Sequence, residues 1–293
     1  MSDSQCTLTT GYITADFHLP NWHGLPSTAI SRYLPGGWVL SDRQDRTDTR
    51  VRIQITTGPG HIETLPNEVT IHLTSSAAAS PALGFTTYTA MERARQQRRM
   101  VTLHGSAAAH DRGAVVLLGH KAAGKTTTAF ALARRGWSHA GDDLIVLGHD
   151  QAGLFLMPGK PTAAVRPQET EEFYRQKPLL DLRPVLTAGR TTVALIVRLT
   201  VHPHARPLAV PAAPFSSGEY LRLHENLARY ISGLPTPVSG LIGAPYGVTW
   251  ALDTPQCARW RTHLINRMER NRFFYVHAPT AEAAADLIEG LMP

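Results

Sequence analysis

The chain has very few cysteines and lacks any long apolar segment. Its 293 residues include two cysteines, Cys6 and Cys257, which lie in different halves without the spacing of a metal site. This pattern predicts a reduced, cytoplasmic protein. No run approaches the roughly 18 apolar residues that a membrane-spanning helix needs. The first residues, Met1-Ser2-Asp3-Ser4-Gln5, carry no basic stretch ahead of an apolar one, so neither a membrane span nor a secretory leader is expected.

The chain is also poor in the features of a nucleic-acid-binding surface, although its net charge is +6. The densest basic runs are 93–99 and 267–272, and neither is interleaved with aromatic residues that could stack on bases. We interpret both runs as solvated surface, and nucleic acid is not an expected partner. Internal repeats and low-complexity tracts are absent. An apolar content of 43% with 18% charged residues is typical of a globular protein.

The most informative segment is 115–147, which reads VVLLGHKAAGKTTTAFALARRGWSHAGDDLIVL. An apolar run at 115–118 precedes a match to the pattern G-x-x-x-x-G-K-[ST], and a helical apolar face follows at 126–135. Loops of this type wrap backbone N–H groups around phosphates at a helix N-terminus. The residues expected to contact a nucleotide are Gly119, His120, Lys121, Ala122, Ala123, Gly124, Lys125, Thr126 and Thr127.

Two adjacent carboxylates, Asp142 and Asp143, follow Lys125 by seventeen and eighteen residues. They lie between the glycine that ends the predicted helix, Gly136, and an apolar strand at 144–147. Gly-Asp-Asp is also an ordinary sequence for a helix-to-strand turn. Beside a complete phosphate loop we favour a catalytic interpretation, in which one acid serves Mg²⁺ and the other accepts a proton from an attacking hydroxyl.

A histidine lies upstream of the loop, in Thr102-Leu103-His104-Gly105. Asp111-Arg112-Gly113 is a turn signal, which predicts a hairpin of residues 101–109 with residues 114–118. Such a hairpin would carry His104 alongside the far end of the second strand, close to the phosphate loop.

This combination of His-Gly, a Gly-Lys-Thr loop and Gly-Asp-Asp resembles the HPr kinase/phosphorylase family, over about residues 101–148. The resemblance implies the mixed-sheet α/β fold that this family shares with phosphoenolpyruvate carboxykinase. It implies ATP and Mg²⁺ as cofactors. It further implies that Asp142 is the general base, that Asp143 and Thr126 serve the metal, that Lys125 contacts the phosphates and that His104 supports the base. It also makes a homo-oligomer an open possibility.

The resemblance is weaker after about residue 148. The stretch 156–161, LMPGKP, followed by Ala164-Val165-Arg166-Pro167, resembles small HPr-kinase-like proteins, in which Arg166 would reach the phosphates. Arg166 is equally well explained as a surface arginine. The Glu- and Gly-containing signature that the regulatory enzymes carry is not found, which leaves recognition of HPr and phosphorolysis without support.

The first part of the chain has a different texture. Residues 1–95 are rich in Pro, Gly, Thr and Trp, with alternating runs at 49–55 and 68–73 and a small-residue stretch at 75–81 that reads as a linker. We expect two domains, a β-rich module of residues 1–95 and a nucleotide-binding domain of residues 96–293. In the second, strands and helices alternate irregularly, as a mixed-sheet α/β domain requires.

The expected function is a kinase that transfers the γ-phosphate of ATP to a hydroxyl of a small molecule or peptide, as a biosynthetic tailoring enzyme. One alternative is a regulatory or scaffold protein that binds a nucleotide without transferring phosphate. The intact set of His104, Lys125, Asp142 and Asp143 argues against it, because a binder needs no general base. Two further alternatives are a serine kinase acting on HPr or another protein and a kinase acting on RNA hydroxyls, the latter resting on the basic charge alone.

Overall fold

The computed structural model describes residues 4–9, 13–19, 39–41, 50–78, 82–164, 179–231 and 252–293. The chain divides into two compact units. One unit consists of Met1–Val101 and Leu227–Arg261, and the other of Thr102–Asn226 and Thr262–Pro293. The domain boundary expected after residue 95 stays a prediction.

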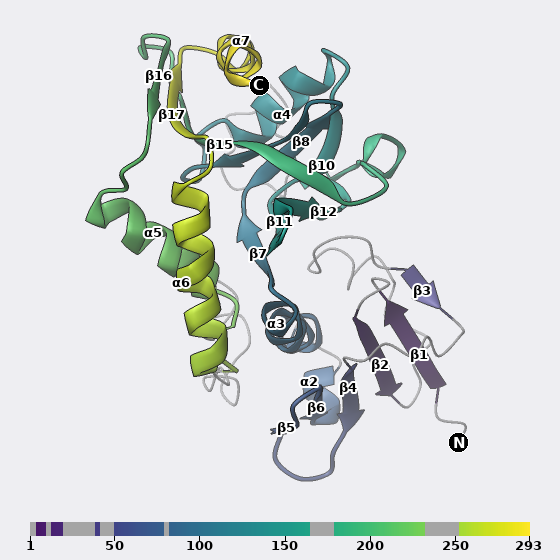
Figure 1. Ribbon diagram of the computed structural model, residues 1–293. Helices are drawn as coiled ribbons and strands as arrows, with labels where there is room; N and C mark the ends of the chain where they lie inside the picture. The colour runs from purple at the N-terminus through teal and green to yellow at the C-terminus, as the bar shows by residue number, and fades with distance from the viewer. Residues whose placement is uncertain are drawn as a thin grey trace. The chain divides into compact units, whose positions relative to one another are not determined.

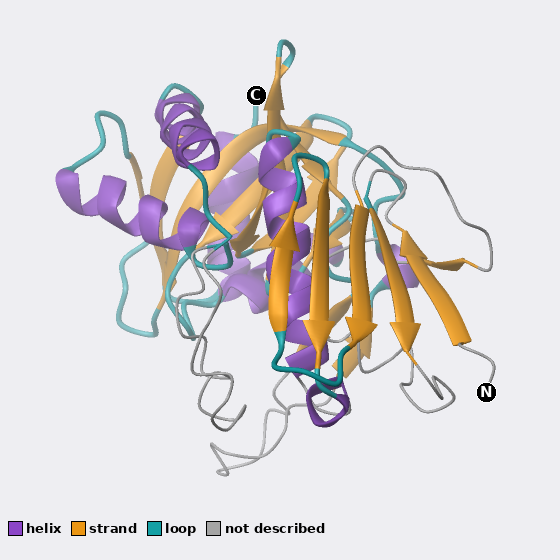
Figure 2. Cartoon of the chain, turned by 90° about the horizontal axis from the view of Figure 1, so that it is seen from below, coloured by secondary structure: helices purple, strands orange, loops and turns teal. Residues whose placement is uncertain are grey.

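The first unit contains a six-stranded sheet in the order β3-β1-β2-β4-β6-β5. Its strands lie side by side near the N-terminus in Figure 2. They are β1 (Ser4–Thr9), β2 (Thr14–Leu19), β3 (Val39–Ser41), β4 (Arg50–Ile55), β5 (His61–Thr64) and β6 (Glu68–Leu73). β2, β4 and β6 are parallel to one another, whereas β5 is an edge strand that pairs antiparallel with β6. The strands predicted at 49–55 and 68–73 are therefore present.

Alternation along β4 and β6 fixes which face of this sheet is covered. Val51 and Ile53 on β4, and Val69 and Ile71 on β6, are buried, while the residues between them are only partly so. Successive side chains of a strand point to opposite faces, so these apolar residues share one face. Helix α3 (Ala82–Gln97) packs against β4 and β6. The expected linker at 75–81 is wrong in its first part, because Ser75–Ala78 forms the short helix α2, whose Ala77 and Ala78 are buried.

The second unit is built on a nine-stranded mixed sheet whose main path runs β10-β8-β9-β15-β12-β11-β7. These strands are β7 (Met100–His104), β8 (Ser106–His110), β9 (Gly113–Leu118), β10 (Ser138–Gly141), β11 (Leu144–Asp150), β12 (Gly153–Met157) and β15 (Thr191–Val201). β15 runs parallel to β9 and to β17 (Phe273–Ala278), and β16 (Leu208–Pro211) pairs with β17. The predicted α/β class with a mixed sheet is confirmed.

Two helices, α4 (Lys125–Ala133) and α7 (Ala281–Leu291), pack on this sheet and on each other (Figure 1). Their small and branched residues, such as Ala129, Leu132 and Ile288, bury Leu117 of β9 and Leu195 of β15 in a common core. At the rim, Arg135, two residues past the end of α4, pairs with Glu289 on α7 at 2.8 Å. The core holds β9 and α4 in place, and with them the loop that joins them.

The other elements are a two-stranded sheet of β13 (Thr162–Ala164) and β14 (Leu179–Asp181), the 3-10 helix η2 (Arg183–Val185), and helices α5 (Ser217–Ala228) and α6 (Pro255–Glu269). Within the described residues, no helix is both long enough and apolar enough to cross a membrane.

The expected hairpin of 101–109 with 114–118 is only partly correct. β8 and β9 do form a hairpin, with Ser106 opposite Leu117. Gly105, however, separates β8 from β7, and β7 leaves to pair beside β11 at the other end of the sheet path. A Cβ at Gly105 would lie 2.8 Å from the carbonyl oxygen of Leu117, so a side chain would not fit at this break. His104 consequently lies on β7 and not in the hairpin.

Candidate active site

The loop between β9 and α4 has the geometry that its sequence predicts. β9 ends at Leu118 and α4 begins at Lys125, directly after the loop. Gly124 has a φ of +87° and a Cβ there would lie 2.7 Å from Val201, so both the backbone conformation and the space require glycine. The backbone N–H of Val201 donates to Ala123 at 3.1 Å, which attaches the loop to the end of β15. α4 begins without a side-chain cap, as expected where a ligand contacts the first turn.

Lys125 is the first residue of α4, and its side chain reaches back into this loop. Its ammonium donates hydrogen bonds to the carbonyl oxygens of Gly119 at 3.0 Å and His120 at 2.9 Å, and only 8% of the residue is exposed. By contrast, His120, Lys121, Ala122 and Thr127 are exposed. The loop therefore presents an open rim with a lysine ammonium held at its centre.

Asp142, at the junction of β10 and β11, is almost completely buried and 2% exposed. Two hydroxyl groups donate to its carboxylate: Ser106 Oγ at 2.5 Å, and Thr126 Oγ1 at 2.9 Å to one oxygen and 3.2 Å to the other. Burial raises the pKa of Asp142, against the lowering effect of the two hydroxyl donors. The Asp142 carboxyl group thus lies beside the first turn of α4, in surroundings that disfavour its charged form.

Asp143 has different surroundings. Its side chain is 47% exposed, and its carboxylate lies 3.2 Å from His104 Nδ1 and 3.4 Å from Lys160 Nζ. Its partial burial would raise the pKa, but the hydrogen bond from His104 and the positive charge of Lys160 outweigh this and hold the pKa of Asp143 well below its usual range. Its φ of +63° is a conformation that Asp tolerates better than most residues. The carboxylate is therefore ionised and open to solvent on one side.

Backbone contacts fix this arrangement. The N–H of Gly105 donates to the carbonyl of Asp143 at 3.2 Å, which brings β7 to the aspartate pair. The N–H of Gly159 donates to Ala140 at 2.7 Å and that of Lys160 to Leu144 at 2.9 Å, which places the Lys160 side chain beside Asp143. Asn226 accepts from the backbone N–H of His104 at 3.1 Å.

The structure thus places His104, Thr126, Asp142 and Asp143 in connected contacts beside the Lys125 loop, with two differences from expectation. His104 contacts Asp143, whereas the resemblance implied support of Asp142. The Thr126 hydroxyl donates to Asp142, whereas it was expected to share a metal with Asp143. Arg166 lies outside the described residues. The roles of all these residues stay predictions.

Sequence reasoning missed two members of the cluster, Ser106 and Lys160. Ser106 follows His104-Gly105 directly, but a single serine in a run of alanines carries no spacing signal. Lys160 lies in the LMPGKP stretch that carried part of the resemblance, yet its position depends on the approach of Gly159 to β10 and β11, which only the fold reveals.

Comparison with known proteins gives a limited result. The chain matches no family model and no curated protein. Among solved structures it is similar to the HPr(Ser) kinase/phosphatase from Coxiella burnetii, with 18% sequence identity and a TM-score of 0.28. The alignment covers 36% of this chain and 76% of that one. This likeness is distant and partial, so function has to be inferred from the contacts described above.

Proposed function

We propose that the second unit is a kinase that transfers the γ-phosphoryl group of ATP to a hydroxyl, with Mg²⁺ as cofactor. The observation that carries the proposal is the contact between the phosphate loop and the aspartate pair: Thr126, the residue after the loop lysine, donates to Asp142, and Asp143 is paired with His104. A protein that only holds a nucleotide has no need of a positioned, ionised acid on the open side of the site.

The residues present fit a nucleotide triphosphate. Two hydrogen bonds of the Lys125 ammonium go to neutral loop carbonyls, and phosphate oxygens are stronger, charge-assisted acceptors for an ammonium group. The exposed rim of the loop and the uncapped first turn of α4 would contribute backbone N–H groups.

The residues also fit Mg²⁺, which prefers oxygen ligands. Because the Thr126 hydroxyl donates its proton to Asp142, the lone pairs of its oxygen remain for a cation. When bound, Mg²⁺ would neutralise charge on the transferring phosphoryl group. A cation at this position would also lower the cost of the buried Asp142 charge.

These contacts support a division of labour that differs from the one the resemblance implies. In our proposal Asp142 and Thr126 hold the metal, because they contact each other. Asp143 accepts the hydroxyl proton, because its half-exposed carboxylate can be reached by an acceptor and His104 orients it. Lys160 keeps Asp143 ionised. The opposite assignment has one observation in its favour, the raised pKa of Asp142, which would make it the stronger base.

The acceptor is proposed to be a compact hydroxyl compound or a peptide side chain, and the protein is proposed to be a biosynthetic tailoring enzyme in the cytoplasm.

The test is to incubate the full chain with ATP, Mg²⁺ and a panel of hydroxyl-bearing metabolites and Ser/Thr peptides, and to record products heavier by one phosphate. The matched control is Lys125→Ala, in which nucleotide affinity and turnover should both fall while the fold survives. Tight ATP binding without transfer to any acceptor would instead favour the regulatory or scaffold function. A Lys125→Ala protein that binds and transfers like the parent would refute the phosphate-loop assignment.

A further inference from the structure

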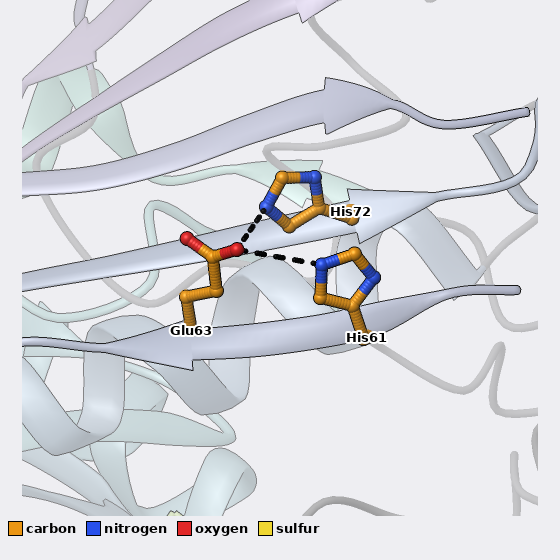
Figure 3. A group of neighbouring side chains, drawn as sticks. All are labelled: His61, Glu63 and His72. Carbon is orange, nitrogen blue, oxygen red and sulfur yellow. Dashed lines mark ion pairs between the residues drawn. The ribbon is translucent and has the colours of Figure 1, made fainter. Parts of the chain in front are cut away.

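The edge of the first unit's sheet carries a cluster that has no part in the proposed kinase chemistry. Its members are His61 and Glu63 on β5 and His72 on β6 (Figure 3). One ligand atom from each residue can be chosen so that all three lie within 4.8 Å of one another. We propose that these three side chains bind one divalent transition-metal ion of the Zn²⁺ type.

Strand register places the three residues together. His61 is directly opposite His72 in the antiparallel β5–β6 pair, and Glu63 is two residues further along β5. Residues two apart on a strand share a face, so all three point away from the covered side of the sheet. Ile71 of β6, next to His72 in sequence, is buried on that covered side. The cluster therefore follows from the hairpin itself.

The distances are close to those of a metal site. Nε2 of His61 and Nε2 of His72 each lie 3.5 Å from the same oxygen, Oε1 of Glu63 (Figure 3). Zinc–ligand bonds of about 2.0–2.2 Å in a tetrahedral arrangement separate two ligand atoms by roughly 3.3–3.6 Å. Only small movements would thus bring each nitrogen to the right distance from the carboxylate oxygen.

The second nitrogen of each ring has a partner of the kind that metal-binding histidines use. His61 Nδ1 lies 3.3 Å from the carbonyl oxygen of Pro59, to which it can donate. The Gln54 side-chain amide nitrogen, directly across on β4, lies 3.1 Å from His72 Nδ1 and 3.4 Å from its Nε2, so Nδ1 is the nearer of the two ring nitrogens. A half-turn of that amide exchanges its nitrogen for its oxygen, which would then accept the Nδ1–H. Both rings would then carry their protons on Nδ1 and present Nε2 lone pairs toward Glu63, as metal ligation requires.

One adjustment is needed. The two imidazole rings are stacked, with centroids 4.0 Å apart and planes inclined by 6°, so their lone pairs lie in two nearly parallel planes that do not meet at one point between the rings. His61 must tilt for both nitrogens to meet one ion. Its side chain is 50% exposed, against 14% for His72, which leaves it free to move while His72 stays fixed by Gln54. Three protein ligands would leave one position for water, and the ion would attach edge strand β5 to β6.

The test is a competition of the purified full chain with a chromogenic chelator for Zn²⁺, with excess Mg²⁺ present to occupy the oxygen-rich site around Asp142. We expect one Zn²⁺ per chain that binds at least tenfold more weakly in His61→Gln, His72→Gln and Glu63→Gln. Gln54→Leu should weaken binding by about tenfold to a hundredfold, the usual effect of losing a partner of a ligating histidine. His277→Ala, which removes an exposed histidine of β17, is the control and should bind as the parent does.

Thermal unfolding without metal shows whether each variant is folded, and a folded variant that binds Zn²⁺ like the parent would overturn the proposal. So would a parent chain that takes up no Zn²⁺, in which case the cluster is a carboxylate paired with two imidazoles. Kinase activity is a separate readout: its absence would count against the proposed function and leave the zinc result unaffected.

Discussion

Asp142 and Asp143 are neighbours in the chain, but their carboxylates face different partners. Asp142 accepts from Ser106 and Thr126 in a buried position, and Asp143 meets His104 and Lys160 at the surface. Adjacent residues at the start of a strand have side chains that point in different directions. The positive φ of Asp143 increases the angle between the two side chains. This difference makes the two acids separable by experiment.

The proposed division predicts different defects for the two asparagine variants. Asp143→Asn keeps the size of the side chain but accepts no proton, so it should bind Mg-ATP normally and lose about 10²–10⁴-fold in turnover. Asp142→Asn should instead raise the Mg²⁺ concentration needed for half-maximal rate. Titration of Mg²⁺ against rate for both variants measures this. The reverse pattern would establish the assignment that the resemblance implies, and identical profiles would refute both.

His104 should act through Asp143. Its removal in His104→Ala is expected to lower turnover by about tenfold to a thousandfold, with little change in ATP affinity. Because the His104 hydrogen bond holds the pKa of Asp143 down, the variant should have a higher pKa at this group. If ionised Asp143 is required, activity should then be lost at a higher pH than in the parent as the solution is acidified.

The pH–rate profile of His104→Ala is the deciding measurement. His277→Ala serves as the control, since this exposed histidine belongs to the same unit and lies on β17. If the role of His104 were purely structural, His104→Ala would lower the thermal stability and leave the acidic limb of the pH–rate profile where it is in the parent.

At the level of elements, the site depends on the close approach of the β12–β13 connection to β10 and β11. A Cβ on Gly159 would lie 2.8 Å from three backbone atoms, namely Ala140 O, Gly141 Cα and Leu144 O. Backbone atoms cannot move aside as a flexible side chain can. Gly159→Ala should therefore destabilise the protein by roughly 1–3 kcal/mol and displace Lys160 from Asp143.

The matched control for this substitution is Gly189→Ala, because a Cβ at Gly189 would meet nothing within 4 Å. Chemical denaturation of both variants, together with turnover, tests the prediction. A Gly159→Ala protein as stable and active as the Gly189→Ala protein would show that the approach is not required.

The β9–α4 loop and strand β7 illustrate what the sequence could and could not predict. The strand–loop–helix arrangement around Lys125 was predictable because its residues are contiguous and its glycine and lysine positions are set by local geometry. The position of His104 was not, because a turn signal at 111–113 says where a hairpin turns and not where its first strand ends. Gly105 ends that strand through a contact with Leu117, and β7 then finds a partner, β11, about forty residues away in the chain.

At the scale of the whole molecule, Asp142 and Asp143 affect the free energy of unfolding in opposite directions. Burial raises the pKa of Asp142, so its contribution to folding is favourable while it is protonated and is lost as pH rises through its folded pKa. The pKa of Asp143 is lowered, so its contribution is present above the unfolded pKa and is lost as pH falls through the folded one. At neutral pH the chain therefore bears a cost at Asp142 and a gain at Asp143.

Asp142→Asn should accordingly raise the melting temperature at pH 7 relative to the parent, and the advantage should shrink as the pH is lowered and the parent's Asp142 takes up a proton. Asp143→Asn should lower the melting temperature at pH 7, since the contacts with His104 and Lys160 lose their charge. Asn tolerates the positive φ at this position as Asp does, so the loss would not come from backbone strain. Unfolding of both variants, without nucleotide or metal and across the range from acidic to neutral pH, measures the two effects.

Shifts of the same sign at pH 7 would mean that the two carboxylates do not differ as their surroundings indicate. Opposite shifts, with Asp142→Asn more stable yet impaired in its use of Mg²⁺, would identify Asp142 as a charge that the protein keeps for function at a cost in stability.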